Sequence, residues 1–303
     1  MKQLFVWGVL LAVMQIPPSI YAAPIKVITT TEDLAAITRE IGGDRVRVDF
    51  IAKGVQDPHF IEAKPSYMLK LSRAKLFVQV GLGLEGEWVP PLLTGARNIK
   101  LLRGGNGHVD ASEGVALLEI PKGRLDRSAG DAHGQGNPHY WLDPLNGKQI
   151  AQNIGEGLKR VDPKGKAQYD HNIIRFSERL DSAMKRWSEA LKPFKGEKVI
   201  TYHNSWPYFL QRFGLTAVGY VEPKPGIPPS SSHLIQLIQR IKEEKVKIII
   251  VEPYFGAKTP QFVARKSGAK VIGLPPSVSK ATGVTDYFQL FDHIVATLTT
   301  ALE

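Results

Sequence analysis

The sequence contains no cysteine. No disulfide can therefore hold the fold together, and a lipid-modified N-terminal cysteine is excluded as a membrane anchor. Any metal site has to be built from histidine, aspartate and glutamate, because thiolate ligands are missing. The chain also lacks the H-E-x-x-H helix motif of many zinc proteases. Metal chemistry in this protein would thus rest on imidazoles and carboxylates.

Long apolar runs are scarce as well. The main one, residues 4–14, follows Lys2 and is broken by two prolines before the small residues Ala22 and Ala23. It is too short to span a bilayer, which needs about 20 apolar residues. A positive start, a short apolar run and a small-residue end are typical of a secretory signal peptide. We therefore predict that residues 1–23 are a signal peptide and that the mature protein is periplasmic, with no lipid anchor.

Acidic residues are in the minority. The sequence has 39 Lys and Arg against 29 Asp and Glu, a balance that could suit a nucleic-acid partner. The basic residues are scattered, however, and do not alternate with aromatic residues as in a nucleic-acid surface. An exported chain also rarely meets nucleic acid. We expect a solvated cationic surface, no nucleic-acid partner and a monomer.

The remainder of the chain, about 280 residues, is long enough for two lobes. Eight short stretches, rich in β-branched residues, have the pattern of strands covered on both faces. They are IKVIT (25–29), VRVDFI (46–51), LFVQV (76–80), NIKLL (98–102), KVITY (198–202), TAVGYV (216–221), KIIIV (247–251) and KVIGL (270–274). Helical patterns lie between them at 31–43, 64–74, 230–245 and 259–268. This alternation predicts an α/β fold in which each lobe is a mostly parallel sheet flanked by helices.

A different pattern separates the two halves. Apolar residues from Tyr169 to Leu191 recur at spacings of three and four, which predicts one long amphipathic helix. We expect residues 163–192 to form a rigid helix that links an N-terminal lobe (24–162) to a C-terminal lobe (193–303). Within the first lobe, residues 103–137 are rich in Gly, Asp, Ser and Arg and are predicted to form a long mobile surface loop.

Three histidines share unusual surroundings. His59 in DPHF and His139 in NPHYW each stand between a proline and an aromatic residue, and His203 directly follows a predicted strand. Glu252 directly follows another strand. Because ligands bind beyond the carboxyl ends of parallel strands, we expect these side chains to converge. Any one of them alone is better explained as a packed or capping residue, but the repetition favours a rigid metal site.

At these motifs the chain resembles the zinc- and manganese-binding solute receptors of bacterial ABC importers, the group with a single rigid linking helix. The resemblance covers nearly the whole mature chain. It rests on DPHFIEAKPS, GNPHYWLDP, YHNSWPYF, VEPKPGIPPSSSHL, VEPYF and TDYFQLFD, which occur in the family's order. The resemblance implies metal ligands at His59, His139 and His203.

The fourth ligand is where the chain departs from the family. Many members carry an aspartate shortly after the last strand, but here the region reads LPPSVSK (274–280). Glu252 is the first candidate replacement, Asp286 the second and water the third. His133, from the predicted loop, is a further candidate.

The ligand set favours zinc. Imidazoles with few carboxylate oxygens suit tetrahedral Zn²⁺, whereas Mn²⁺ prefers more oxygen ligands. Family members that resemble manganese receptors carry a carboxylate where His203 stands. We therefore expect Zn²⁺ to be the transported ligand, with Mn²⁺ or Fe²⁺ as the alternative cargo.

The expected function is capture of the metal between the lobes and its delivery to the membrane permease of an ABC importer, with no enzymatic step. A zinc-dependent hydrolase is the rival of another class, because three histidines and an open position also suit catalytic zinc. A periplasmic zinc metallochaperone is a further alternative.

Overall fold

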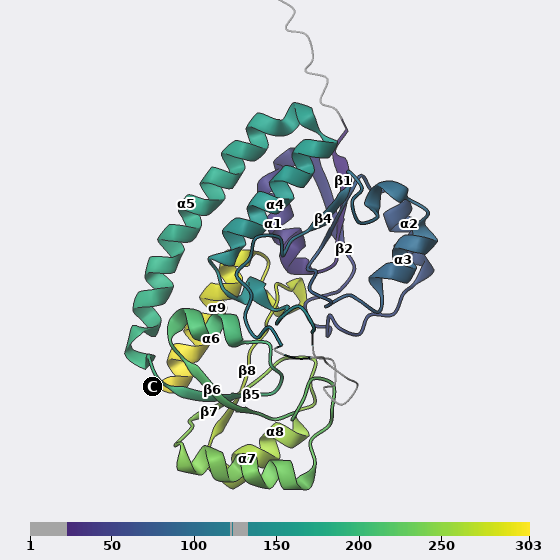
Figure 1. Ribbon diagram of the computed structural model, residues 1–303. Coiled ribbons are helices and arrows are strands. Elements are labelled where there is room, and N and C mark those ends of the chain that lie inside the picture. The colour runs from purple at the N-terminus through teal and green to yellow at the C-terminus, as the bar shows by residue number, and fades with distance from the viewer. Residues whose placement is uncertain (1–22, 122, 124–132) are drawn as a thin grey trace, which may run out of the picture.

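The computed structural model describes residues 23–121, 123 and 133–303. The predicted signal peptide, 1–23, lies outside the described residues except for its last position. The described chain forms two lobes, each built on a four-stranded parallel sheet, with one long helix running beside both (Figure 1). The predicted fold class is confirmed.

The N-terminal sheet has the strand order β2-β1-β3-β4. Its strands are β1 (Ile25–Thr29), β2 (Val46–Phe50), β3 (Leu76–Gln79) and β4 (His108–Asp110). Successive residues of β1 face opposite sides, so that Val27 packs in a core with helices α1 (Glu32–Gly42) and α4 (Asn146–Val161). Ile28 packs in a second core with α2 (Pro65–Ser72) and α3 (Val89–Ala96). Helices thus cover both faces of the sheet, as its apolar strands require.

The C-terminal sheet repeats this plan with the order β6-β5-β7-β8. Its strands are β5 (Lys198–Thr201), β6 (Thr216–Tyr220), β7 (Ile248–Val251) and β8 (Lys270–Gly273). Ile248 and Ile250 share a core with α6 (Pro207–Phe213) and α9 (Tyr287–Leu302). Ile249 lies on the opposite side, in a core with α7 (Ser231–Glu243) and α8 (Lys258–Ser267).

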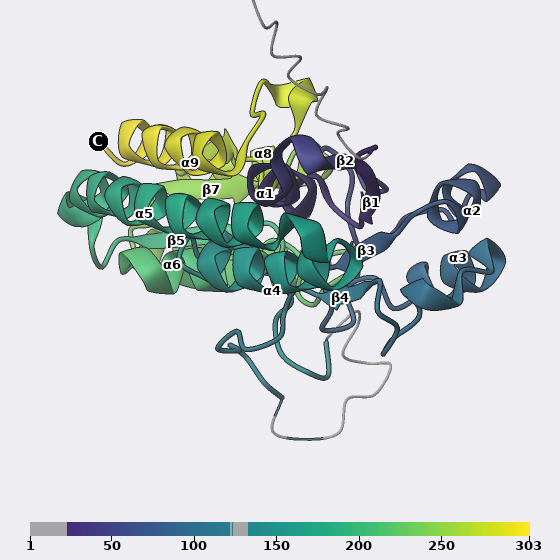
Figure 2. The ribbon, with the colours of Figure 1, turned by 90° about the horizontal axis from the view of Figure 1, so that it is seen from above.

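The long helix α5 spans Lys166–Leu191, which confirms the prediction of a helical connector. It contacts α1 and α4 of the first lobe and α9 of the second (Figures 1 and 2). Its buried stripe follows the predicted spacing and consists of Tyr169, Ile173, Phe176, Leu180, Ala183, Met184, Trp187 and Leu191. These residues belong to a single hydrophobic core that runs from β1 to α9. The two lobes are therefore joined by packed apolar surface as well as by the chain.

One strand prediction was wrong. Residues 98–102 form no strand, and Ile99–Leu101 is a short 3-10 turn with Ile99 78% exposed. The fourth strand is β4, inside the segment 103–137 that was expected to be loop, and it pairs with β3. The apolar residues of NIKLL suggested a buried strand, but only Leu101 of the turn is buried. Residues 122 and 124–132 of the predicted loop lie outside the described residues.

Short 3-10 turns complete the framework. They span Gly43–Arg45 (η1), Ile99–Leu101 (η2), Tyr140–Leu142 (η4), Pro163–Gly165 (η5), Lys192–Phe194 (η6) and Lys280–Thr282 (η7). Within the described part of the chain, none of the helices has the length and apolar character needed to cross a membrane.

Candidate metal centre

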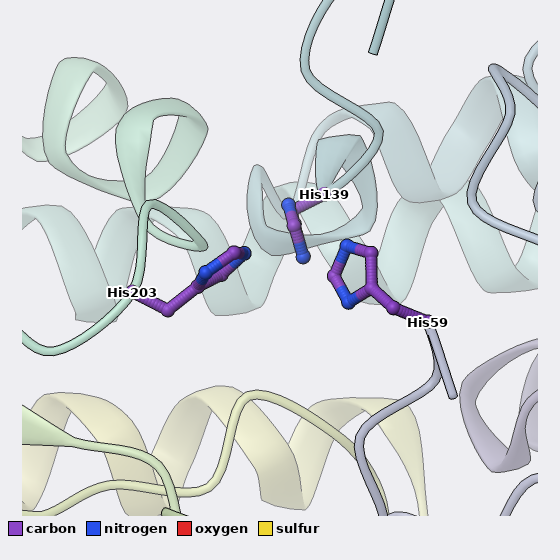
Figure 3. A group of neighbouring side chains, drawn as sticks. All are labelled: His59, His139 and His203. Carbon is purple, nitrogen blue, oxygen red and sulfur yellow. The ribbon is translucent and has the colours of Figure 1, made fainter. Parts of the chain in front are cut away.

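His59, His139 and His203 converge as expected. They come from the loop after β2, the residue before η4 and the second position after β5, and Figure 3 shows their rings turned toward one another. One ring nitrogen of each lies within 4.8 Å of the other two. The residues are only 7%, 2% and 5% exposed. Three buried imidazoles facing a common point have an arrangement that could hold one metal ion.

Two of the rings are held by the residue two positions earlier. Asp57 Oδ1 accepts hydrogen bonds from the backbone N–H of His59 at 3.0 Å and from its Nδ1 at 2.7 Å. Asn137 Oδ1 accepts the same pair from His139, both at 3.0 Å. In each case a proline separates acceptor and histidine and restricts the turn. Because Nδ1 donates its hydrogen, the lone pair of each ring is on Nε2, the atom that would bind a metal.

His203 is held from another strand. Its Nδ1 donates to Oε1 of Glu222, a buried residue two positions beyond β6. The backbone around it is fixed as well, because Thr201 Oγ1 donates to the carbonyl of His203 at 2.7 Å. All three histidines thus have Nδ1 paired with an oxygen, an arrangement typical of metal-binding histidines.

The electrostatics of the rings differ. Burial lowers the pKa of His139 well below its ordinary value, and the neighbouring His59 and His203 lower it further. Its Nε2 is buried without a hydrogen-bond partner among the described residues. Burial is the largest influence on His203 and disfavours its charged form, but the hydrogen bond to Glu222 and the negative charges of Glu252, Glu222 and Asp57 together outweigh burial and raise the pKa of His203. A neutral, unpartnered Nε2 is what a metal ion requires of a histidine ligand.

His133 approaches the same point. Its Nε2 lies 3.2 Å from Nε2 of His59, and the two rings stack with centroids 5.2 Å apart. Burial lowers the pKa of His133 to about 4, with further contributions from His59 and His203, so the ring is neutral near pH 7. Nitrogen ligands of tetrahedral zinc, at about 2.0–2.1 Å from the metal, lie about 3.3 Å apart. The spacing of this pair matches one edge of such a site, but His133, like Glu252, lies outside the mutual 4.8 Å cluster of the other three histidines.

Glu252 and Asp286, the acidic candidates for the fourth ligand, have different surroundings. Glu252 is fully buried, and its Oε1 accepts from Ser205 Oγ at 2.8 Å and Trp206 Nε1 at 3.0 Å. Its Oε2 has no partner among the described residues, and burial raises its pKa to about 7. It is not part of the mutual 4.8 Å cluster. Asp286 caps α9 and accepts the backbone N–H of Phe288 and Gln289, each at 2.9 Å.

Three residues of the site were missed by sequence reasoning, namely Asp57, Asn137 and Glu222. A signal for the first two was present, because D-P-H and N-P-H repeat one pattern in which the residue two positions earlier can accept from Nδ1. Glu222 had no comparable signal, because its contact with His203 depends on the pairing of β5 with β6.

The chain is similar to known proteins along nearly its whole length. A family model described as "Zinc-uptake complex component A periplasmic" matches residues 27–301. The high-affinity zinc uptake system protein ZnuA of Yersinia pestis is 27% identical, covering 84% of this chain and 83% of the relative. The manganese ABC transporter substrate-binding lipoprotein PsaA of Streptococcus pneumoniae is 26% identical, covering 82% of this chain and 78% of the relative.

Solved structures agree with the sequence comparison. A crystal structure of ZnuA superposes with a TM-score of 0.77 at 27% identity, covering 92% of this chain and all of that chain. The similarity therefore includes both lobes and the connecting helix.

Proposed function

The chain belongs to the family of periplasmic components of zinc-uptake complexes, and from that premise we propose that it is the Zn²⁺ receptor of an ABC importer. It captures the ion between its two lobes and delivers it to a membrane permease. The transported ion is cargo, so the protein needs a site that binds tightly without carrying out a reaction.

The arrangement of three buried imidazoles carries this proposal. His59, His139 and His203 present ring nitrogens within 4.8 Å of one another. Their Nδ1 atoms are paired with Asp57, Asn137 and Glu222. Such a ligand set, with one position left for a fourth donor, suits tetrahedral zinc.

For the fourth ligand, the contact with His59 supports His133. Its Nε2 is 3.2 Å from that of His59, near the spacing expected across a zinc ion. Glu252 is the alternative, because its buried Oε2 lacks a partner. Asp286 uses Oδ1 to cap α9 and lies outside the cluster of three histidines, which argues against a role in the site.

Manganese is the second candidate cargo, favoured by the relative named as a manganese receptor. Mn²⁺ prefers oxygen ligands, however, and the clustered donors are nitrogens. Fe²⁺ also accepts imidazole ligands, but its characteristic protein site combines two histidines with a carboxylate. The nitrogen donors therefore support Zn²⁺ over both.

The family consists of transport receptors, which argues against a hydrolase. Glu252, the conceivable general base, already accepts two hydrogen bonds through Oε1. We propose that the mature protein is a periplasmic monomer, and that it carries no lipid anchor because the sequence contains no cysteine to hold one.

The test is a competitive zinc titration of the purified, metal-free protein against a chromophoric chelator. One zinc per chain is expected, and His139→Ala should weaken zinc affinity by more than roughly a hundredfold, since even outer residues of metal sites contribute 10–100-fold. His171→Ala, at an exposed position of α5, is the matched control and should bind like the parent protein. Equal affinities for both variants would refute the site, and tighter binding of Mn²⁺ than Zn²⁺ would change the cargo.

A further inference from the structure

The turn that carries His139 belongs by sequence to the N-terminal lobe, between β4 and α4, but most of its polar contacts reach the C-terminal lobe. Tyr208 Oη donates to the carbonyl of Asn137 at 2.8 Å. Trp141 Nε1 donates to the carbonyl of Pro276 at 2.8 Å, and Tyr287 Oη donates to the carbonyl of Trp141 at 2.6 Å. The turn is also bonded to the N-terminal lobe. Tyr140 Oη donates to Val80 O at 2.7 Å, and Asn137 donates from its backbone N–H to Leu118 O at 2.9 Å and from Nδ2 to Glu119 Oε2 at 3.0 Å.

The strongest of these contacts is an ion pair. Arg212 of α6 donates from Nε to Asp143 Oδ1 at 2.8 Å and from Nη2 to Oδ2 at 2.6 Å. Two parallel charge-assisted bonds fix both the distance between the Arg212 and Asp143 side chains and their relative orientation. Asp143 also accepts a hydrogen bond from the backbone N–H of Leu145 at 3.0 Å. The carboxylate that Arg212 holds is therefore bonded to the backbone of the turn as well.

The same helix follows His203. Helix α6 begins at Pro207, four positions after His203, and includes both Tyr208 and Arg212. Helix α6 also packs in the shared core with η4, whose first residue follows His139. One helix therefore sets the position of two ligands that are 64 residues apart in the sequence.

His59 is held by different elements. The carbonyl of Pro58 accepts from Trp88 Nε1 at 2.9 Å, and Trp88 belongs to the core beneath α2 and α3. This layer lies on the far side of the N-terminal sheet from α5, as Figure 2 shows. The first ligand therefore depends on an outer layer, and the other two depend on α6.

We propose that Arg212, through its paired bonds to Asp143, is a positioning residue that holds His139 at a fixed position relative to His203. These two ligands would then be placed together by contacts with the C-terminal lobe before the metal binds. The inference rests on the proposed zinc site. His59 then completes the site from the N-terminal lobe.

A double-mutant cycle on the full chain tests this inference with Zn²⁺ as the probe. Arg212→Ala should weaken zinc affinity about 10–100-fold, the usual effect of losing an orienting partner. Arg212→Ala should cause the same fold loss of zinc affinity in a His59→Ala background, where His139 still binds the metal. In a His139→Ala background the factor should fall to within about twofold, because the ligand that Arg212 positions is gone.

The control is Arg45→Ala, which removes an equivalent paired bridge to Asp162 at 2.8 and 3.0 Å, away from the site. It should leave zinc affinity unchanged in every background. An equal effect of Arg212→Ala with and without His139 would show general loss of structure and overturn the inference. If Arg212→Ala fails to fold, Asp143→Asn replaces it, and thermal unfolding of the metal-free variants shows which preparations are folded.

The outcomes also separate this inference from the proposed function. If His139→Ala binds zinc as tightly as the parent, the zinc site itself is wrong. If His139→Ala loses affinity while Arg212→Ala does not, the site stands and only the positioning role is refuted.

Discussion

At the scale of single residues, the site depends on how each histidine is oriented. A free imidazole can present either nitrogen, and selecting one rotamer and one tautomer costs free energy at the moment of binding. Asp57 and Asn137 remove that choice through two bonds each, one to the backbone and one to Nδ1. The buried carboxylate of Glu222 orients the His203 ring through a single hydrogen bond from Nδ1. The rings are therefore oriented before the metal arrives.

Glu222→Ala should consequently weaken zinc affinity about 10–100-fold while the ligands themselves remain. Glu222→Gln keeps an oxygen acceptor for Nδ1 of His203 and should recover part of that loss. The measurement is the chelator competition titration for both variants. Equal loss in both would mean that the charge of Glu222 matters and the orientation of the ring does not.

At the scale of secondary structure, short runs rich in β-branched residues predicted strands whether or not those strands are fully buried. The predicted strands at 25–29, 198–202 and 247–251 match the mostly buried β1, β5 and β7 to within one residue at each end. Those at 46–51, 216–221 and 270–274 match the less buried β2, β6 and β8 equally well. Strand β4 was not predicted from the sequence, because only Val109 of its three residues is buried. Helix α4 contains three glycines and was likewise missed. Gly155 and Gly157 are close-packing positions there, since an added Cβ would lie 2.4 Å from Ile173 and 2.3 Å from Val109.

The convergence of His59, His139 and His203 could be predicted from sequence, because proline and aromatic residues repeat beside the first two and His203 follows a strand. Their partners across the lobes could not. The contacts of Arg212 with Asp143 and of Glu222 with His203 depend on how distant elements pack. A single sequence carries no local pattern for such pairings.

The buried stripe of α5 allows a prediction for this element. Leu180 is fully buried in the core shared by both lobes, so Leu180→Ala should lower the free energy of unfolding by about 2–5 kcal/mol. Ile174, on the same helix, is 57% exposed, and Ile174→Ala should change it by less than about 0.5 kcal/mol. Urea unfolding of the metal-free proteins measures both values. Similar losses for the two variants would contradict the role of α5 as a packed connector.

At the scale of the whole molecule, one hydrophobic core extends through both lobes and α5. A wide hinge opening would expose much of this surface to water, so the contacts available for adjustment are those near the site. One of them is Asp33 in the first turn of α1. Its carboxylate accepts from Ser277 Oγ and, at 2.8 Å, from the backbone N–H of Val278 in the other lobe. This buried link joins the lobes without involving a proposed ligand.

Asp33 makes the contact between lobes dependent on pH. Burial raises its pKa to about 7 from the ordinary value of 3.8, with bonds from Ser277 and Val278 acting in the opposite direction. The folded protein therefore holds this proton more tightly than the unfolded chain between about pH 4 and pH 7. The stability that Asp33 contributes is fully present below pH 4 and is lost as pH rises toward 7. The free energy of unfolding of the parent, relative to Asp33→Asn, should fall over this range.

Urea unfolding of both metal-free proteins between pH 4 and pH 7 measures that difference. The asparagine in Asp33→Asn keeps an acceptor for Val278 and a group that can pair with Ser277, but it does not titrate. Asp181→Asn, on the exposed face of α5, controls for the loss of a surface carboxylate. A difference that rises with pH would mean that Asp33 is ionised in the folded state and that the link between the lobes is stabilised by charge, because the sign of the slope reports which state holds the proton.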